Sequence, residues 1–488
     1  MDFSSLLLSI FVFATFVFTA FYLFNILPLI RSLTQIIKNS HRTVDWAAEL
    51  LLASPTGTVT VAPIVFTADP SNVEHTAKSH FYNYPRSNFV TSAFHEFLGD
   101  GILNSNGEQW KLQRKMASYE FSTGSLRTFV LEKVGHVIQE RLLPLLKSAS
   151  MRAEVLDLQD VFERFAFDNI STIAIDYDPD CLSRKNEIGE RLYGAFDEAA
   201  NISLERSKLP FSFLWKLKKL LNIRSERRLR ESMAVINEFL AESFIRSKGI
   251  SVESTEKRGG FLSKFARDAR QSDKFVGELL VNLMLAGRDT TPSALTWFFW
   301  LVQSSSSGRV VVGKILEEVR SVRKSQGTSD EGKFFTLDSL RQMNYLHAAI
   351  SESMRLYPPV PLVARECQAN DTLPDGTAVK KGWMVMYSPM AMGRSKKIWG
   401  KDCAEFRPER WLVDGVFRAR SPFEHTVFHA GRNMCLGKDM AFIQMKAVAA
   451  SVLERFEMEA VEERGKHECL VTLKMEGGLP VIVRERRK

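Results

Sequence analysis

One cysteine near the C-terminus has the surroundings of a metal ligand or a nucleophile. Cys435 lies in the run Phe428-His429-Ala430-Gly431-Arg432-Asn433-Met434-Cys435-Leu436-Gly437, and the amphipathic pattern of residues 440–456 predicts a helix directly after it. The positive end of a helix dipole and the free N–H groups there stabilise a thiolate. Gly431 and Gly437 would let backbone N–H groups approach the sulfur. A buried structural cysteine is the alternative for a single cysteine without such neighbours.

A second group that could do chemistry lies in the apolar segment 275–302. This segment predicts one buried helix of about 28 residues. Its middle reads Ala286-Gly287-Arg288-Asp289-Thr290-Thr291-Pro292, where charge, hydroxyl groups, glycine and proline are all costly. Because local rules are broken mainly at functional sites, we interpret Asp289 and Thr290 as a proton-transfer pair. Gly287 would permit close approach of a flat ligand. The alternative is a kinked core helix whose hydroxyls bond carbonyls.

Two further pairs have the spacing of neighbours on a helix. Trp110 and Arg114 are four residues apart, and an indole beside a guanidinium can hold a carboxylate. Glu352 and Arg355 are three apart, and the proline-rich run 356–361 follows them at once. Such proline density fixes a loop path, which favours a structural ion pair over a solvated surface pair.

The composition limits what class of protein these residues serve. The chain has 488 residues, of which 45% are hydrophobic, so it can bury a large core. The cysteines show neither CxxC pairs nor regular spacing, which argues against a zinc site or a disulfide framework and favours a reducing compartment. The net charge of +8 suits an anionic membrane surface or an acidic partner. No basic stripe with interleaved aromatic residues is present, so we expect no nucleic-acid partner.

The N-terminus predicts a membrane anchor. Residues 3–30 carry no charge, and this run is longer than the ~20 residues that a bilayer core requires. Basic residues follow it, which places the rest of the chain in the cytosol. A cleaved signal peptide is the alternative, but the run is too long and lacks a basic start. We therefore predict an anchor at 1–30, a connector at 31–55 and a single domain at 56–488.

The body of the chain predicts long helices with little sheet. Residues 58–61 and 64–67 read as a short hairpin, and Asp69 and Pro70 open a helix. The segment 206–230 is both basic and apolar. It reads as a helix that lies on a membrane, and an ordinary surface helix is the alternative.

Four of these motifs, taken in order, resemble the cytochrome P-450 superfamily. They are the threonine-bearing helix, the Glu352/Arg355 helix, the loop Phe406-Arg407-Pro408-Glu409-Arg410 and the cysteine loop. The resemblance implies the P-450 fold, mainly α with small β-sheets. It implies that Cys435 ligates the iron of haem b within a loop that includes Phe428, Gly431 and Gly437. Asp289 and Thr290 would then be the oxygen-activating pair.

The resemblance also assigns roles around the haem. Trp110 and Arg114 would hold haem propionates, with Arg365 as a further contact. The superfamily usually has a basic residue where this chain has Asn433, and Arg432 stands one position earlier. Glu352, Arg355 and Arg410 would form a structural triad behind the haem. The substrate channel would include Leu285, Ala286, Val360, Leu362 and Leu479, the last in a C-terminal hairpin beside Gly477 and Gly478.

Finer motifs look like the plant P-450 clan of fatty-acid ω-hydroxylases. These are Met392-Gly393-Arg394, Ile398-Trp399-Gly400-Lys401-Asp402 and Leu436-Gly437-Lys438-Asp439-Met440. We therefore expect a monooxygenase of the endoplasmic reticulum that hydroxylates the terminal or near-terminal carbon of a long aliphatic chain. A fatty acid is the substrate we expect before any other. NADPH-cytochrome P-450 reductase would supply the electrons. A sterol side chain and a jasmonoyl amino acid are the alternative substrates, and a non-catalytic haem- or lipid-binding protein is the alternative outside the class.

Overall fold

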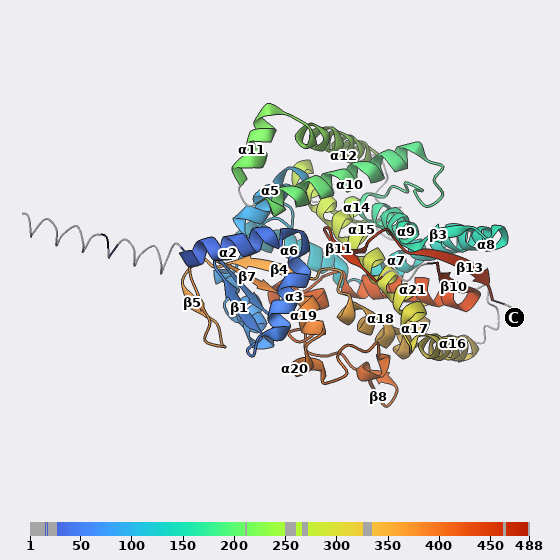
Figure 1. Cartoon of the computed structure of the whole chain (residues 1–488). Helices are drawn as coiled ribbons and strands as arrows, with labels where there is room; N and C mark the ends of the chain where they lie inside the picture. The colour runs from blue at the N-terminus through green and yellow to red at the C-terminus, as the bar shows by residue number, and fades with distance from the viewer. Residues whose placement is uncertain are drawn as a thin grey trace, which may run out of the picture.

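The computed structural model describes residues 15, 17, 27–209, 212–248, 260–265, 272–325, 334–461 and 465–486, and the following statements concern these residues. They form mainly helices, as the sequence predicts (Figure 1). The α-helices are α2 (Leu27–Lys38), α3 (Thr43–Ala53), α4 (Pro70–Glu74), α5 (Asn88–Leu98), α6 (Gly107–Ser122), α7 (Gly124–Val137), α8 (Leu143–Arg152), α9 (Leu158–Ile175), α10 (Glu187–Lys208), α11 (Ser212–Leu221), α12 (Ser225–Lys248), α14 (Phe261–Phe265), α15 (Asp273–Ser304), α16 (Gly308–Ser325), α17 (Leu337–Gln342), α18 (Asn344–Leu356), α19 (Pro389–Gly393), α20 (Lys396–Trp399) and α21 (Lys438–Arg455).

The strands form small sheets at the edges of the helical body. The largest has the order β1-β2-β7-β4, in which β1 and β2 are the predicted hairpin and β2 pairs in parallel with β7. A second has the order β10-β13-β3, and three two-stranded sheets pair β5 with β6, β8 with β9 and β11 with β12. The strands are β1 (Thr58–Val61), β2 (Ile64–Thr67), β3 (Val155–Asp157), β4 (Val363–Glu366), β5 (Asp371–Thr372), β6 (Ala378–Val379), β7 (Met384–Tyr387), β8 (Leu412–Val413), β9 (Val416–Phe417), β10 (Phe456–Ala460), β11 (His467–Cys469), β12 (Leu473–Met475) and β13 (Pro480–Glu485).

Helix α15 runs through the middle of the molecule (Figure 1) and is the long buried helix that the sequence predicts. It is capped at its start by Ser272, whose hydroxyl accepts a hydrogen bond from the Phe275 N–H at 3.2 Å. The helix continues through Pro292, although proline removes one backbone donor. It packs on α9, α16, α18 and α21, so most of its surface is buried. This central position lets α15 contribute side chains to any site in the core.

The anchor predicted for residues 1–30 lies mostly outside the described residues, and no helix within the described part is long and apolar enough to cross a membrane. The connector predicted for 31–55 is largely helical. Within α3, Trp46, Ala47 and Leu51 are buried in the main core. The packed body of the protein therefore begins before the predicted boundary at residue 56.

Candidate active site

The cysteine loop folds tightly between a short 3-10 turn at Gly431–Asn433 and helix α21. The Cys435 N–H donates to the Phe428 carbonyl at 2.8 Å, which closes the loop on itself. Gly431 has φ +62°, and a Cβ there would lie 2.2 Å from the Ala77 carbonyl oxygen. Only glycine fits this position, for reasons of packing and backbone conformation. The prediction that Gly431 lets backbone N–H groups approach the sulfur is separate from this contact with Ala77 and stays a prediction.

The start of α21 surrounds the Cys435 sulfur with donors. Burial raises the pKa of the Cys435 thiol. The backbone N–H groups of Gly437 and Lys438 and the charges of Arg114 and Lys438 act in the opposite direction. A Cβ on Gly437 would lie 3.8 Å from the sulfur, so Gly437 does sit against it. These groups offset only part of the effect of burial, and the net pKa of the thiol stays above its ordinary value. The stabilised thiolate predicted for this helix end therefore remains a prediction.

Arginine side chains gather beside this loop without carboxylates. Burial and the charges of Arg365 and Arg114 lower the pKa of Arg86 to about 9. The same three guanidinium groups, together with burial, lower the pKa of His429 to about 4. None of the three arginines forms an ion pair with a carboxylate within the described part of the chain. A cluster of cations in one buried region is unfavourable by itself, so it indicates a place for an anionic group.

Three separate elements position these arginines. Arg114 lies on α6, four residues after the buried Trp110, and donates to the Met434 carbonyl next to the cysteine. Arg365 lies on β4. Arg86 precedes α5, and its backbone is held by the side chain of Asn106, which stands just before α6. The Asn106 side chain accepts a hydrogen bond from the Arg86 N–H at 3.0 Å and donates one to the Arg86 carbonyl at 3.2 Å. The Arg86 guanidinium also donates to the Ser105 carbonyl at 2.8 Å.

The middle of α15 carries the predicted proton-transfer pair on different faces. The Thr290 hydroxyl donates to the Ala286 carbonyl at 2.8 Å, and both residues are only partly buried. Asp289 is buried and lies 3.3 Å from Arg288. A Cβ on Gly287 would lie 2.7 Å from the Ile170 side chain of α9. A side chain at position 287 is therefore excluded by Ile170, and the close approach of a flat ligand to Gly287 stays a prediction.

The loop after α18 and the C-terminal hairpin β11–β12 meet beside α15. The Leu473 N–H donates to the Pro359 carbonyl at 2.9 Å, and the Leu473 carbonyl accepts from Ser293 and Trp297 of α15. The Thr472 hydroxyl donates to the Asp289 carbonyl at 3.4 Å. The turn between β11 and β12, residues 470–472, is thus the one that meets the middle of α15.

This arrangement places Leu479 away from the part of the hairpin that meets α15, where it is expected from the sequence. Leu479 is buried near the start of α9, where its N–H donates to Asp157 at 2.8 Å and its carbonyl accepts from Leu158 at 2.9 Å. It lies after the turn at Gly477 and Gly478, and that turn is not the one beside Asp289. Among the other channel predictions, Leu285 is buried, and three residues are partly buried: Ala286, Val360 and Leu362.

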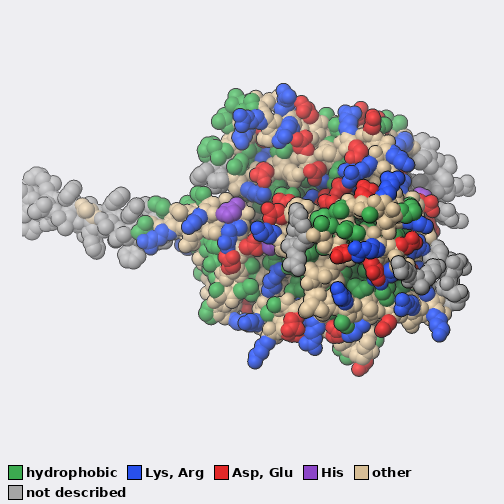
Figure 2. Space-filling view, turned by 45° about the vertical axis from the view of Figure 1, so that its right-hand side comes forward, with side chains coloured by type: hydrophobic (Ala, Val, Ile, Leu, Met, Phe, Trp, Pro, Cys, Tyr) green, Lys and Arg blue, Asp and Glu red, His purple; other side chains and the backbone are tan. Residues whose placement is uncertain are grey.

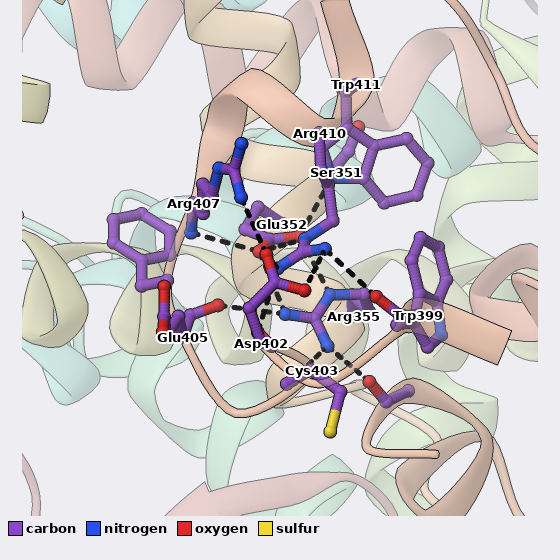
Figure 3. A network of polar contacts seen from close by, with 12 residues as sticks. Ser351, Glu352, Arg355, Trp399, Asp402, Cys403, Glu405, Arg407, Arg410 and Trp411 are labelled. Atoms are coloured by element: carbon purple, nitrogen blue, oxygen red, sulfur yellow. Dashed lines mark hydrogen bonds and ion pairs between the residues drawn. The ribbon is translucent and has the colours of Figure 1, made fainter. Parts of the chain in front are cut away.

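The predicted ion-pair triad forms as one buried network (Figure 3). Arg355 donates from two nitrogens to the Glu352 carboxylate, each at 2.8 Å, and Arg410 Nε donates to it at 2.9 Å. The same carboxylate accepts from the Trp411 indole at 2.9 Å and from the Arg407 N–H at 3.0 Å. Arg355 also donates to the carbonyls of Cys403 and Gly393. The network therefore joins α18 to the segment 393–411 that follows it.

Comparison with known proteins agrees with these features. The sequence profile of the family "Cytochrome P450" matches residues 23–478. The chain is 47% identical over 459 residues to Cytochrome P450 CYP94D108 of Paris polyphylla, covering 93% of this chain and 91% of that protein. It is 40% identical over 476 residues to both Cytochrome P450 94A1 of Vicia sativa and Cytochrome P450 94B1 of Arabidopsis thaliana. The first alignment covers 94% and 90% of the two chains, and the second covers 94% and 91%.

The chain belongs to the cytochrome P450 family. It is a haem-dependent monooxygenase that receives electrons from NADPH through a reductase. The plant origin of these relatives confirms the resemblance to a plant P450 clan. The donor set fits haem on two counts. The cysteine sulfur faces backbone donors at the start of α21, and the arginine cluster supplies the positive charge that two haem propionates would need.

Two residues of this P450 were missed by sequence reasoning. Arg86 belongs to no motif used above, and only its place in Tyr84-Pro85-Arg86-Ser87, a proline-fixed approach to a helix, could have drawn attention to it. His429 stands inside the cysteine loop, and its Nδ1 lies 3.3 Å from the Tyr387 hydroxyl of β7. Both are neighbours of Arg365, which follows only from the packing of β4 against β7.

Arg432 does not supply the positive charge that the superfamily usually has at the position of Asn433. Arg432 is exposed, and its guanidinium donates to the Tyr82 hydroxyl at 2.8 Å and lies 4.9 Å from the centre of that ring. The Asn433 side-chain oxygen is buried and has no hydrogen-bond partner among the described residues. The extra cation near the loop is therefore Arg86, and the buried Asn433 amide is left with free hydrogen-bonding capacity.

Proposed function

We propose that this P450 hydroxylates the terminal or near-terminal carbon of a long aliphatic chain, and that its substrate is a fatty acid. The observation that supports this proposal is the set of finer sequence motifs, which look like those of the plant clan of fatty-acid ω-hydroxylases, and the plant relatives support the same clan. The residues predicted to line the channel are apolar: Leu285 is buried, and Ala286, Val360 and Leu362 are partly buried. An apolar channel would favour a hydrocarbon end over a polar group.

Each group of residues around the haem would have a separate role. When bound, haem supplies the iron and the redox chemistry of oxygen activation. Cys435 would hold the iron through its thiolate. Arg86, Arg114 and Arg365 would hold the propionates, with Trp110 packed beside them. Thr290 and Asp289 would hold and move protons at their hydroxyl and carboxyl oxygens. Glu352, Arg355 and Arg410 would keep the segment behind the haem in place.

The surface of α11 supports contact with a membrane, which we propose to be the cytosolic face of the endoplasmic reticulum. Most of its apolar side chains are exposed and lie among lysines, while Trp215 is buried and anchors the helix. The exposed apolar residues are Phe213, Leu214, Leu217, Leu220 and Leu221. A basic and apolar helix surface of this kind suits anionic lipid. Figure 2 shows apolar side chains beside basic ones at the upper left edge of the molecule. Lipid contact there would let a dissolved substrate enter directly.

The surface around the cysteine loop would receive the reductase. Lys111 and Arg432 both lie over the Tyr82 ring, and Lys438 lies over Phe428. Lys115 is exposed on the same helix as Lys111. These basic side chains would attract an acidic partner.

Product analysis tests the substrate. Microsomes that contain this P450, its reductase and NADPH would receive long-chain fatty acids, a jasmonoyl amino acid and a sterol. The proposal predicts a terminally or near-terminally hydroxylated fatty acid. A product from the sterol or the jasmonoyl conjugate alone would refute the fatty-acid assignment and leave the reaction type intact. The Cys435→Ala variant, which should form no product, is the control for background activity.

A further inference from the structure

Arg288 is a cation inside the core that is shared by two carboxylates. It lies on α15 next to Asp289, its side chain is 2% exposed, and it pairs with both Asp197 and Asp289. Its guanidinium also lies 5.0 Å from the centre of the Tyr193 ring. Asp197 and Tyr193 both belong to α10, so Arg288 connects α10 to α15.

The two carboxylates hold this cation unequally. The Arg288 Nη2–Asp197 Oδ1 distance is 2.6 Å, whereas Nη1 lies 3.3 Å from Asp289 Oδ1. The closer partner is the more exposed one, because the Asp197 side chain is 40% exposed and that of Asp289 is 6% exposed. Asp289 therefore has the longer contact with Arg288, although its burial makes an unpaired carboxylate more costly there than at Asp197.

The charges around Asp289 come from four elements. Burial raises the pKa of Asp289, Arg288 and Lys474 lower it, and the charge of Asp197 raises it again. Lys474 of β12 is itself held by Glu163 of α9, with a 2.9 Å distance between Nζ and Oε1. The contact with Arg288 is thus the one ion pair of Asp289 within the described residues.

We propose that Asp197 is a positioning residue of the oxygen-activating site, which holds Arg288 in competition with Asp289 and so keeps the Asp289 carboxyl able to donate a proton. This inference rests on the proton-transfer role proposed above for Asp289. A carboxylate at the surface, on a helix other than α15, thereby sets the protonation of an acid in the core. Without Asp197, the Arg288 guanidinium would be free to pair fully with Asp289 and stabilise it as a carboxylate.

The test removes the Asp197 charge and follows the ionisation of Asp289 directly. Infrared difference spectra between the haem-loaded protein and its Asp289→Asn variant isolate the carboxyl band of protonated Asp289, which is titrated with pH. In an Asp197→Asn background, the midpoint should move to lower pH by about one unit. Asp197→Ser should give the same shift, and Asp197→Glu should leave the midpoint near that of the original protein.

Glu198→Gln is the matched control, because Glu198 is the next residue of α10 and faces Ser232 and Arg228 instead. An unchanged midpoint in Asp197→Asn, or an equal shift in Glu198→Gln, overturns the proposal. The titration uses no substrate, so it fails or succeeds independently of the fatty-acid assignment. During turnover, Asp197→Asn should also raise the solvent isotope effect on NADPH oxidation with dodecanoic acid, while the carbon-monoxide spectrum stays unchanged.

Discussion

Removing Arg86 should loosen the haem without weakening the rest of the fold. Its guanidinium shares a buried region with those of Arg114 and Arg365, and no described carboxylate pairs with it. A hydrogen bond between charged groups contributes about 1.5–3 kcal/mol. Loss of one such bond to a propionate should therefore weaken haem binding by about 10- to 150-fold in Arg86→Gln.

The assay measures the rate at which haem passes from the P450 to excess apomyoglobin. Arg432→Gln is the matched control, because Arg432 stands next to Asn433 but is exposed and bound to Tyr82. We expect haem loss to accelerate in Arg86→Gln and to stay unchanged in Arg432→Gln. Equal rates in both variants and the original protein would refute the assignment of Arg86.

The haem-free protein gives an independent reading of the same substitution. Without propionates, Arg86 is a cation among cations, and burial already lowers its pKa to about 9. Its replacement removes this repulsion together with one hydrogen bond to Ser105. The unfolding free energy of the haem-free protein should therefore change by less than about 1 kcal/mol in urea. A larger loss would show that Arg86 has a structural role instead.

Three further predictions concern other groups. Glu352→Gln leaves the buried Arg355 guanidinium without a charged partner and Arg410 with Asp402 alone, so it should cost about 3–5 kcal/mol in urea unfolding. Asp338→Asn, in an exposed pair, should cost less than about 1 kcal/mol. Burial lowers the pKa of His347 to about 3, whereas this side chain has its ordinary pKa of 6.5 in the unfolded chain. Protonation therefore favours the unfolded chain, and the protein loses stability as the pH falls below 6.5. His347→Phe should therefore gain about 1.4 kcal/mol over the original protein between pH 7.5 and 5.5, measured by thermal unfolding. Thr290→Val should keep the carbon-monoxide spectrum and lower the product formed per NADPH consumed; unchanged coupling would exclude a role for its hydroxyl.

The ion-pair network shows which parts of the fold a sequence can predict. Glu352 and Arg355 are three residues apart on one helix, and Arg410 stands in a short motif, so their contacts follow from local spacing and a recurrent pattern. The same holds for the hairpin β1–β2 and for α15, because alternation and a long apolar run are local signals. The helix after Cys435 ends at Arg455, one residue before its predicted end, since Phe456 pairs in β10.

Contacts between distant segments could not be predicted in this way. Gly287 lies on a helix that is apolar nearly all round, so its sequence does not show which face meets Ile170 and which faces the site. Leu479 follows two glycines that look like a hairpin turn, but the hairpin beside Asp289 turns at residues 470–472, where no glycine occurs. Arg86 joins Arg114 and Arg365 only through tertiary packing.

The most direct test of the account is the carbon-monoxide difference spectrum of Cys435→Ala. The account predicts that the original protein shows the red-shifted band of thiolate-ligated haem and that this band disappears in the variant. Cys469→Ala is the matched control, because Cys469 lies in β11, outside the cysteine loop, and this variant should keep the band. A red-shifted band that survives in Cys435→Ala would show that another residue ligates the iron and would contradict the account.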